Sequence, residues 1–245
     1  EEELAAVPHY FISSHSMHEE VNASTFARYA NDVAERIFAK HDVLVLVGGT
    51  GLYFKAFLEG LDDIPEISST IRQNIVKKYE AEGIEWLQEE IRKSDPKFFA
   101  GGEIRNPQRL MRALEVVQGT GRSIKDFHKG AGVEGAAAKY NVEKFAIDVP
   151  RELLYTNINT RVESMMEDGL LEEAMALEPY RHLNALQTVG YTELFEHFDG
   201  VISLEEAVEK IKKNTRNYAK RQMTWFRKDE QICWISTPGE IIAGR

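Results

Sequence analysis

The sequence predicts an α/β fold, in which helices flank a parallel sheet, with an all-helical insert in the middle of the chain. The apolar run 43–47 has no alternation with polar residues, which favours a strand covered on both faces of a parallel sheet. It leads directly into Gly48-Gly49-Thr50-Gly51 and a helical pattern, the strand, turn and helix unit of doubly wound folds. Residues 62–129 read as charged and helical, and strand patterns return near residue 145. We therefore expect a core of residues 1–61 and 142–245 around an insert of residues 62–141.

Caps, periodicity and glycines predict the elements of the core. Residues 7–12 are expected to be a short extended segment. Ser24 can cap a helix whose apolar side chains recur at helical spacing, namely Phe26, Tyr29, Ala30, Val33 and Ile37. The remaining expected elements are helices at 52–58, 152–167 (ending at Gly169) and 204–226, and strands at 145–149 and 232–235.

The insert is expected to contain three helices and a following loop. Ser68 or Ser69 can cap the first helix, which ends at Gly83, and a second helix follows at 84–93. Pro107 suits the first turn of a third helix that reaches about residue 118, before Gly119. The small residues 130–138 predict a loop.

Composition excludes several classes of protein. The chain has 245 residues, of which 43% are hydrophobic and 29% charged, which is globular composition and not that of a disordered chain. The longest apolar run, 43–47, is far below the ~20 residues of a membrane span. No signal peptide is visible, so we expect a soluble protein of the reducing cytoplasm. The single cysteine, Cys233, excludes an intramolecular disulfide and a Cys-rich zinc site.

The net charge of −10 argues against a generally basic nucleic-acid binder, but one segment departs from this balance. Residues 210–228 contain eight basic residues and no acidic one, together with Tyr218, Trp225 and Phe226. Basic and aromatic side chains on one helix suit contact with RNA phosphates and stacking on bases. The alternative is an aromatic core face and a solvated basic face, and the absence of acidic residues favours nucleic acid.

The turn at 48–51 is the best local candidate for a binding site. Glycines after a strand allow a ligand to approach the backbone, the following helix N-terminus favours an anion, and Thr50 can hydrogen-bond a phosphate. An ordinary strand-to-helix turn is an equal alternative. The pattern Gly130-x-Gly132-x-x-Gly135 matches a dinucleotide fingerprint, but the strand that must precede such a site is missing from the sequence pattern, so we reject it.

A helix face in the insert is open to two interpretations. Arg109 and Arg112 lie three residues apart, and Gln108 offers an amide that can read a base edge. A solvated helix in which these residues pair with Glu115 explains the same spacing, and the spacing alone favours it.

Arg161 also has two interpretations. An arginine beside an apolar stripe can bind an oxyanion with two parallel hydrogen bonds. Pairing with Glu163 or Glu167 is the simpler interpretation. The histidines and carboxylates have no metal-ligand spacing such as H-E-x-x-H.

Four separated segments, in this order, resemble the tRNA dimethylallyltransferases, the bacterial tRNA prenyltransferase family: VGGTGLYFKA at 47–56, NPQRLMRALE at 106–115, VGY at 189–191 and YAKRQMTWFR at 218–227. The resemblance covers about residues 3–236 and includes VPHY at 7–10. It implies a P-loop-type α/β core and a helical insert that grips the anticodon stem. It also implies transfer of a dimethylallyl group from its diphosphate to N6 of the adenosine 3′ of the anticodon, assisted by Mg²⁺, with that adenine flipped out of the loop.

The resemblance also implies roles for individual residues. Thr50 and Arg161 would be catalytic, and the diphosphate would bind to Gly48, Gly49, Thr50 and Arg161. The implied tRNA contacts are Arg72 in the insert and three runs, Gln108, Arg109, Leu110, Met111 and Arg112, then Gln187, Thr188, Val189, Gly190, Tyr191 and Thr192, and then Asn214, Thr215, Arg216, Asn217, Tyr218, Ala219, Lys220 and Arg221. These roles replace the simpler interpretations of Arg161 and of 108–112.

Two motifs of the family do not occur in the sequence. They are the phosphate-binding loop Gly-x-Thr-x-x-Gly-Lys-Thr/Ser and an Asp-Ser-x-x-Ile/Val-Tyr segment whose Asp is the implied general base. The sequence starts at Glu1 without Met, so we expect both motifs upstream of Glu1, together with the first strand of the sheet and a loop hydroxyl that helps to hold Mg²⁺.

Two other functions stay open at this point. An adenylate isopentenyltransferase would prenylate a free nucleotide, although it would need neither the insert nor the basic helix to grip RNA. A remnant that binds tRNA without catalysis would explain the missing motifs. The expected partners are tRNA and dimethylallyl diphosphate, without a membrane, and the expected oligomeric state is a monomer.

Overall fold

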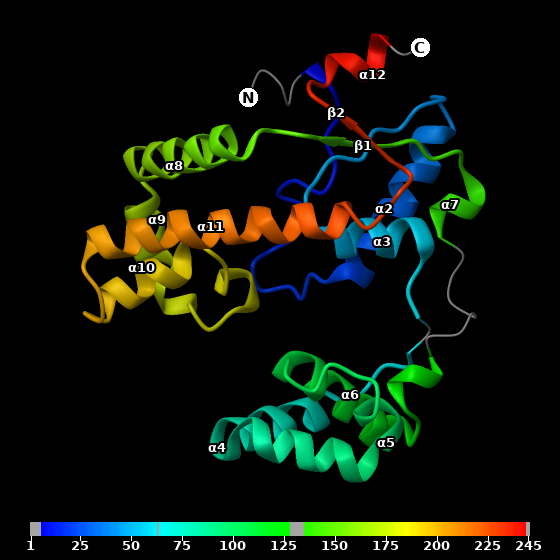
Figure 1. The fold of residues 1–245 in the computed structure, drawn as a ribbon, viewed down its shortest axis with the longest axis vertical. Helices are drawn as coiled ribbons and strands as arrows, with labels where there is room; N and C mark the ends of the chain where they lie inside the picture. The colour runs from blue at the N-terminus through cyan, green and yellow to red at the C-terminus, as the bar shows by residue number, and fades with distance from the viewer. Residues whose placement is uncertain (1–5, 63, 128–134, 244–245) are drawn as a thin grey trace. The chain divides into compact units, whose positions relative to one another are not determined.

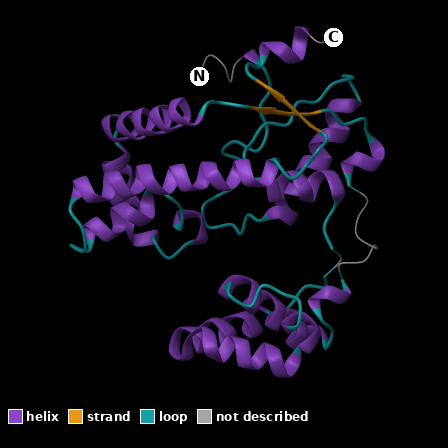
Figure 2. Ribbon diagram, viewed as in Figure 1, coloured by secondary structure: helices purple, strands orange, loops and turns teal. Residues whose placement is uncertain are grey.

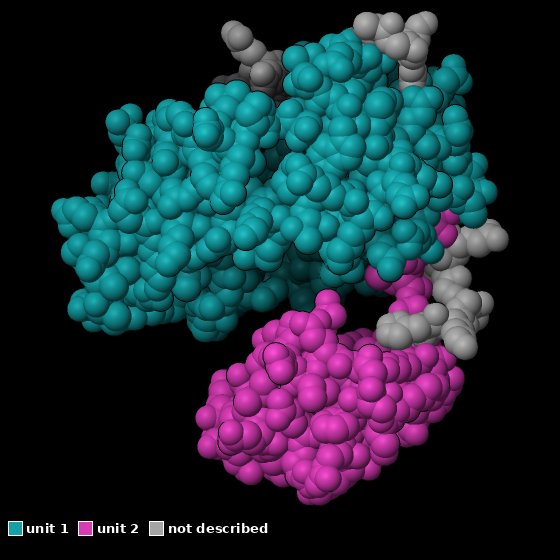
Figure 3. Space-filling model, viewed as in Figure 1, with its two compact units in different colours: residues 1–59, 136–245 teal, residues 60–135 magenta. Residues whose placement is uncertain are grey.

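The computed structural model describes residues 6–62, 64–127 and 135–243 (Figure 1). The chain forms two compact units, residues 1–59 with 136–245 and residues 60–135, here named the core unit and the insert unit (Figure 3). The first two positions of the rejected dinucleotide pattern, Gly130 and Gly132, lie outside the described residues. No helix within the described ranges has the length and apolar character that crossing a membrane requires.

The core unit contains a small parallel sheet (Figure 2). β1, Lys144–Ile147, pairs with β2, Ile232–Ile235, in a register that places Lys144 opposite Ile232 and Ile147 opposite Ile235. The strand expected at 232–235 is confirmed, and the one expected at 145–149 begins one residue earlier and ends at Ile147. The parallel pair is joined through the helices between the two strands, as parallel strands require.

The buried strand expected at 43–47 is wrong. The segment has no strand assignment, and among the described residues the sheet consists of β1 and β2 alone. Val43, Val45 and Val47 are 55%, 79% and 87% exposed, whereas Leu44 and Leu46 pack on the cluster around Ala34 and Phe57. The apolar run is therefore an extended segment that packs through one face only. A strand needs a hydrogen-bonded neighbour, which apolar composition alone does not provide.

Helices make up most of the core unit. They are α2 (Ala23–Phe38), α3 (Gly51–Glu59), α7 (Ala136–Lys139), α8 (Arg151–Glu167), α9 (Leu170–Leu177), α10 (Tyr191–Phe198), α11 (Leu204–Phe226) and α12 (Gly239–Ala243), with 3₁₀ turns η2 (Glu178–Tyr180) and η3 (Asn184–Leu186). α11 has the expected bounds, and a reciprocal pair of hydrogen bonds between Ser203 and Glu206 fixes its start.

Two details at the N-terminal end of the core unit differ from expectation. Asn22, and not Ser24, caps α2, because its side chain accepts hydrogen bonds from the backbone N–H groups of Ser24 and Thr25. The segment expected to be extended at 7–12 turns at Phe11, whose φ is 66°.

The apolar core of the α8 to α11 region is formed by side chains from all four helices, Val162, Leu170, Ala174, Leu194, Ala207 and Ile211. α11 packs on α8 and α10 along this core, and its C-terminal half continues beyond it to contact α3. This one long helix therefore positions the turn before α3 within the core unit.

The insert unit is all-helical in its described residues, with α4 (Ser69–Ser94), α5 (Pro96–Phe99), α6 (Pro107–Thr120) and the 3₁₀ turn η1 (Ile124–Asp126). Ser68 caps α4, and Gly83, with φ 77°, kinks it at the expected break between two helical segments. α6 runs past the expected end at Gly119, because Gly121 is the residue that adopts the left-handed conformation, with φ 69°. The core of this unit lies between α4 and α6 and contains Ile75, Leu87, Ile91, Leu110 and Leu114.

Candidate functional site

The turn at 48–51 is held against α11 by a hydrogen bond and by side-chain packing. The amide Nε2 of Gln222 donates a hydrogen bond to the carbonyl oxygen of Gly49 at 3.0 Å, and a Cβ on Gly49 would lie 1.9 Å from that nitrogen. The indole ring of Trp225 packs so closely on Gly51 that a Cβ there would lie 2.2 Å from two ring atoms. At Gly51 a side chain would displace the rigid indole, so glycine is favoured there because α11 approaches the backbone, where the sequence suggested the approach of a ligand. At Gly49 the close atoms belong to the flexible end of Gln222, which can move aside.

Thr50 presents its hydroxyl at the same turn. Its Oγ1 lies 3.1 Å from the phenolic oxygen of Tyr218, and either group can donate the hydrogen bond. The guanidinium of Arg221 lies over the Tyr218 ring, 5.6 Å from its centroid. Burial, with a smaller contribution from Tyr218, raises the pKa of Tyr53 in α3 above 10.0, so this neighbouring phenol stays neutral. The structure thus brings together Thr50, predicted to be catalytic, and Tyr218, predicted to contact tRNA.

The basic residues at the beginning of the 210–228 segment form partnerships inside the core unit. Lys210 pairs with Glu196 of α10, and Lys212 pairs with Glu163 of α8 at 2.8 Å. Arg216 Nη1 donates to Oδ1 of Asn159, also on α8, at 2.6 Å. These side chains therefore help to fix α11 against its neighbours.

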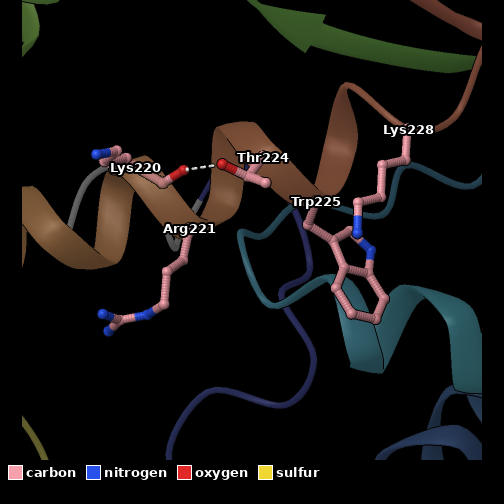
Figure 4. A pocket seen from close by; sticks show the side chains of 5 residues that line it. All are labelled: Lys220, Arg221, Thr224, Trp225 and Lys228. Carbon is pink, nitrogen blue, oxygen red and sulfur yellow. Dashed lines mark hydrogen bonds between the residues drawn. The ribbon is translucent and has the colours of Figure 1, made fainter. Parts of the chain in front are cut away.

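The basic residues farther along the segment are exposed. Lys220, Arg221 and Lys228 form no ion pair in the part of the chain that the structure describes. Together with Thr224 and Trp225 they line an open pocket of about 230 Å³, and Arg221 and Trp225 extend from the same side of α11 (Figure 4). Trp225 is 44% exposed there. Cations beside an exposed indole can bind a phosphate and stack on a base.

A buried carboxylate joins two of the predicted tRNA-contact runs. Glu193 is 2% exposed, its Oε2 accepts from the backbone N–H of Gly190 at 2.8 Å, and its Oε1 accepts from Nδ2 of Asn214 at 2.6 Å. Gly190 has φ 107°, a conformation that favours glycine, and it turns the chain into α10. Glu193 was not among the residues predicted from the sequence. Its position three residues after a turn glycine, at the third residue of a helix, was the available signal.

Tyr191 lies in the same run and donates its hydroxyl to Oε1 of Glu173 on α9 at 2.7 Å. Burial and then the contact with Glu173 raise the pKa of Tyr191 from 10.0 to about 12. Gln187, Thr188 and Thr192 are exposed around it, and Val189 is half-buried.

Arg161 lies on α8 with an exposed side chain. Within the described residues it forms no ion pair or hydrogen bond, and Glu163, one of its two alternative partners, pairs with Lys212. No hydrogen bond among these residues joins Arg161 to Thr50. Its role in binding diphosphate stays a prediction.

Two of the predicted contacts of the insert unit, Arg72 and Arg112, meet at Glu115, which is 5% exposed. Nη1 of Arg72 donates to its Oε2 at 3.3 Å, and Nη1 of Arg112 donates to its Oε1 at 3.0 Å. The ion pair of Arg112 with Glu115, which the spacing alone favoured, is therefore present. Gln108 and Arg109 are exposed on the same helix, and Met111 is half-buried.

Two members of the predicted tRNA-contact runs have buried apolar side chains. Leu110 is fully buried between α4 and α6, and Ala219 is buried on α11. Both side chains pack inside their unit, and their contact with tRNA stays a prediction. Asn217 is exposed and Thr215 is half-buried.

The described residues do not form a metal site of their own. No group of three or more His, Cys, Asp or Glu side chains in residues 6–62, 64–127 and 135–243 is placed to hold an ion. We therefore derive no chemical step through the expected Mg²⁺, which proteins commonly hold by one or two groups together with substrate phosphates.

The family model, the curated relatives and the solved structure reported below agree on one family. The model of the IPP transferase family matches residues 1–229. The tRNA dimethylallyltransferase of Cytophaga hutchinsonii is 42% identical over 240 residues, which are 98% of this chain and 78% of the relative. That of Christiangramia forsetii is 44% identical over 234 residues, 96% of this chain and 76% of the relative.

A solved structure gives the same result for the fold. The tRNA isopentenylpyrophosphate transferase of Bacillus halodurans matches 96% of this chain and 73% of its own, with 33% sequence identity and a TM-score of 0.63. The predicted fold class, a P-loop-type α/β core with a parallel sheet, is confirmed.

Proposed function

Because the chain belongs to the IPP transferase family, we propose that it transfers a dimethylallyl group from dimethylallyl diphosphate to N6 of the adenosine 3′ of the anticodon in tRNA. The relatives named for this reaction match nearly the whole chain at 42% and 44% identity, so the proposal draws on both units.

The observation that carries the proposal is the contact between Thr50 and Tyr218 at 3.1 Å. In the reaction, N6 attacks the allylic carbon, a C–N bond forms, and the C–O bond to diphosphate breaks. N6 gives its proton to a general base, for which the family resemblance implies an Asp that is not in this sequence. The two reactants must be held in line for this displacement. Thr50 stands where the glycine turn meets the helix proposed to contact RNA, so its hydroxyl can orient N6 towards the allylic carbon.

The exposed cations of the core unit suit the two substrates. We assign the diphosphate to Gly48, Gly49 and Arg161, and the tRNA backbone to the cations around Trp225. Fixed cations favour both the RNA phosphates and the negative charge that develops on the departing diphosphate. Magnesium remains part of the proposal as a partner of the diphosphate, and we place the reaction in the cytoplasm, where tRNA is found.

Neither alternative function has support from the relatives. Those compared above are named for tRNA, which does not favour a free nucleotide as the acceptor. They are also named as transferases, which does not favour a remnant without catalysis.

A product assay tests the proposal directly. The full-length protein is incubated with labelled dimethylallyl diphosphate, Mg²⁺ and unmodified tRNA, and the RNA is digested and analysed for prenylated adenosine by mass spectrometry. A parallel reaction replaces tRNA with AMP. We expect product from tRNA and none from AMP. Product from AMP alone would support the free-nucleotide alternative, and bound tRNA without product would support the remnant.

A further inference from the structure

The insert unit holds one buried carboxylate between two surface arginines. Glu115 lies on α6 with a side chain that is 7% exposed, and each of its oxygens accepts from a different guanidinium. Arg72 comes from the first turns of α4 and Arg112 from α6 itself, and their side chains are 57% and 41% exposed. One carboxylate therefore fixes two long side chains that reach the surface from separate helices.

Stability alone does not account for a glutamate at this position. Leu114 and Val116, on either side of Glu115 in α6, are fully buried apolar residues, so this turn of the helix packs inside the unit. A buried ion pair is often no more stabilising than apolar side chains of similar volume, because the charges lose their hydration. Stability therefore gives no clear preference for a glutamate over a leucine or methionine at this position.

Resting on the tRNA function proposed above, we propose that Glu115 is a positioning residue that holds Arg72 and Arg112 ready to bind tRNA phosphates. Each arginine uses Nη1 for the ion pair, and its remaining N–H donors stay available on a half-exposed head group. Arginines that are already fixed lose less conformational freedom when RNA binds, so the affinity is higher. Glu115 itself does not touch the RNA.

The direction in which one mutation changes the affinity for tRNA distinguishes this role from a purely electrostatic one. Glu115→Gln removes a negative charge beside two cations, so attraction to RNA through charge alone would become stronger. If Glu115 positions the arginines, the same change weakens tRNA binding by about tenfold, because two rotamer-rich side chains must then be ordered on binding. Affinity is measured with unmodified tRNA at fixed salt. Unchanged or tighter binding by Glu115→Gln would overturn the proposal.

Glu89→Gln is the matched control. Glu89 also lies in the insert unit and also pairs with two cations, Arg92 at 2.8 Å and Lys93 at 3.5 Å, but its side chain is 41% exposed. Glu89→Gln changes the net charge by the same amount as Glu115→Gln, and we expect no loss of affinity for tRNA. Glu115→Met, which keeps the volume and removes hydrogen bonding, should stay folded by thermal unfolding and yet bind tRNA as weakly as Glu115→Gln.

The dependence on the two arginines gives a second readout. In an Arg72→Ala, Arg112→Ala background, Glu115→Gln should have no further effect on affinity, whereas a purely structural role would keep its effect. In steady-state assays Glu115→Gln should raise the KM for tRNA and leave kcat at saturating tRNA unchanged, and Glu115→Asp should recover part of the affinity. If the wild-type chain binds no tRNA, the proposed function fails and this inference fails with it. If the wild type binds and Glu115→Gln binds equally well, only the role of Glu115 is refuted.

Discussion

The hydroxyl oxygens of Thr50 and Tyr218 lie 3.1 Å apart, and this contact joins two positions that are 168 residues apart in the sequence. It connects the glycine turn with the part of α11 proposed to contact RNA. Thr50→Val keeps the shape of the side chain and removes the hydroxyl. We expect it to lower kcat for tRNA prenylation by about tenfold, which corresponds to ~1.4 kcal/mol of barrier.

Two further variants identify the group responsible for this effect. Thr50→Ser retains the hydroxyl and should keep most of the activity. Tyr218→Phe removes the partner and leaves the Thr50 hydroxyl in place, so it should lower kcat less than Thr50→Val does. Equal turnover by the valine variant and the wild type, measured with both substrates saturating, would remove Thr50 from the chemistry.

Gly51 tests how tightly the turn is packed. In Gly51→Ala the new Cβ would stand 2.2 Å from the rigid indole of Trp225, which has to move. Alanine is a better helix former by up to ~1 kcal/mol, but overpacking of this kind typically costs about 1–3 kcal/mol. We expect a net loss of free energy of unfolding in urea titrations, with a change in tryptophan fluorescence.

Gly48→Ala is the control for this substitution. A Cβ on Gly48 would meet the Phe54 ring at 3.4 Å, an ordinary contact distance. This variant should unfold at nearly the same urea concentration as the wild type. If the two alanine variants behave alike, Trp225 does not pack on Gly51 as described.

The phenol of Tyr191 predicts a pH dependence at the alkaline end. Its pKa is raised from 10.0 to about 12 by burial and by Glu173, so the folded state favours the neutral form. Its contribution to stability is therefore complete below pH 10 and is lost as the pH rises from 10 to about 12. Tyr191→Phe should lower the stability below pH 10 and reduce its fall above that pH, as measured by urea unfolding.

An absorbance titration checks the same value independently. The difference in tyrosinate absorbance between the wild type and Tyr191→Phe isolates one residue among the nine tyrosines of the sequence. A midpoint close to 10.0 in this difference would contradict the partial burial of the Tyr191 phenol and its hydrogen bond to Glu173.

The elements that the sequence analysis placed correctly are those whose signals are local. The helix at 204–226 and the strand at 232–235 have the expected bounds, because an unbroken helical pattern and a short β-branched and aromatic run are visible within one window. The run 43–47 looked equally clear, but a strand also depends on a partner that local sequence does not contain. Asn22 replaced Ser24 as a cap because both side chains can cap and only geometry selects one.

The candidate site could be predicted only in part for the same reason. The family motifs identified Thr50 and the 214–221 run, and the family itself is confirmed. Gln222 was not singled out, because its bond to Gly49 spans 173 residues and no pattern within α11 predicts it. Glu115 and Glu193 were missed as organisers, since the sequence shows a carboxylate but not that it is buried between two partners.

The exposed cations of α11 predict how tRNA binding depends on salt. Lys220→Ala with Arg221→Ala should weaken binding and reduce the slope of log affinity against log salt by about one for each lost phosphate contact. Lys210→Ala with Lys212→Ala removes the same charge from residues that are already paired with Glu196 and Glu163. This control should leave the slope nearly unchanged. A slope that responds equally to both pairs would show that only net charge matters.

Arg161 gives a prediction for the other substrate. Its guanidinium is exposed on α8 and forms no ion pair among the described residues, so it is available to bind a ligand. Since a guanidinium can bind a diphosphate with two parallel hydrogen bonds, Arg161→Ala should raise the KM for dimethylallyl diphosphate by about tenfold or more. Affinity for tRNA, measured without the diphosphate, should stay close to that of the wild type. Arg151→Ala is the control, because Arg151 is exposed on the same helix but lies over the ring of Tyr155. This variant should leave the KM for dimethylallyl diphosphate close to that of the wild type. If Arg161→Ala abolishes tRNA binding and leaves the KM for the diphosphate unchanged, Arg161 belongs to the RNA-binding surface and not to the diphosphate site.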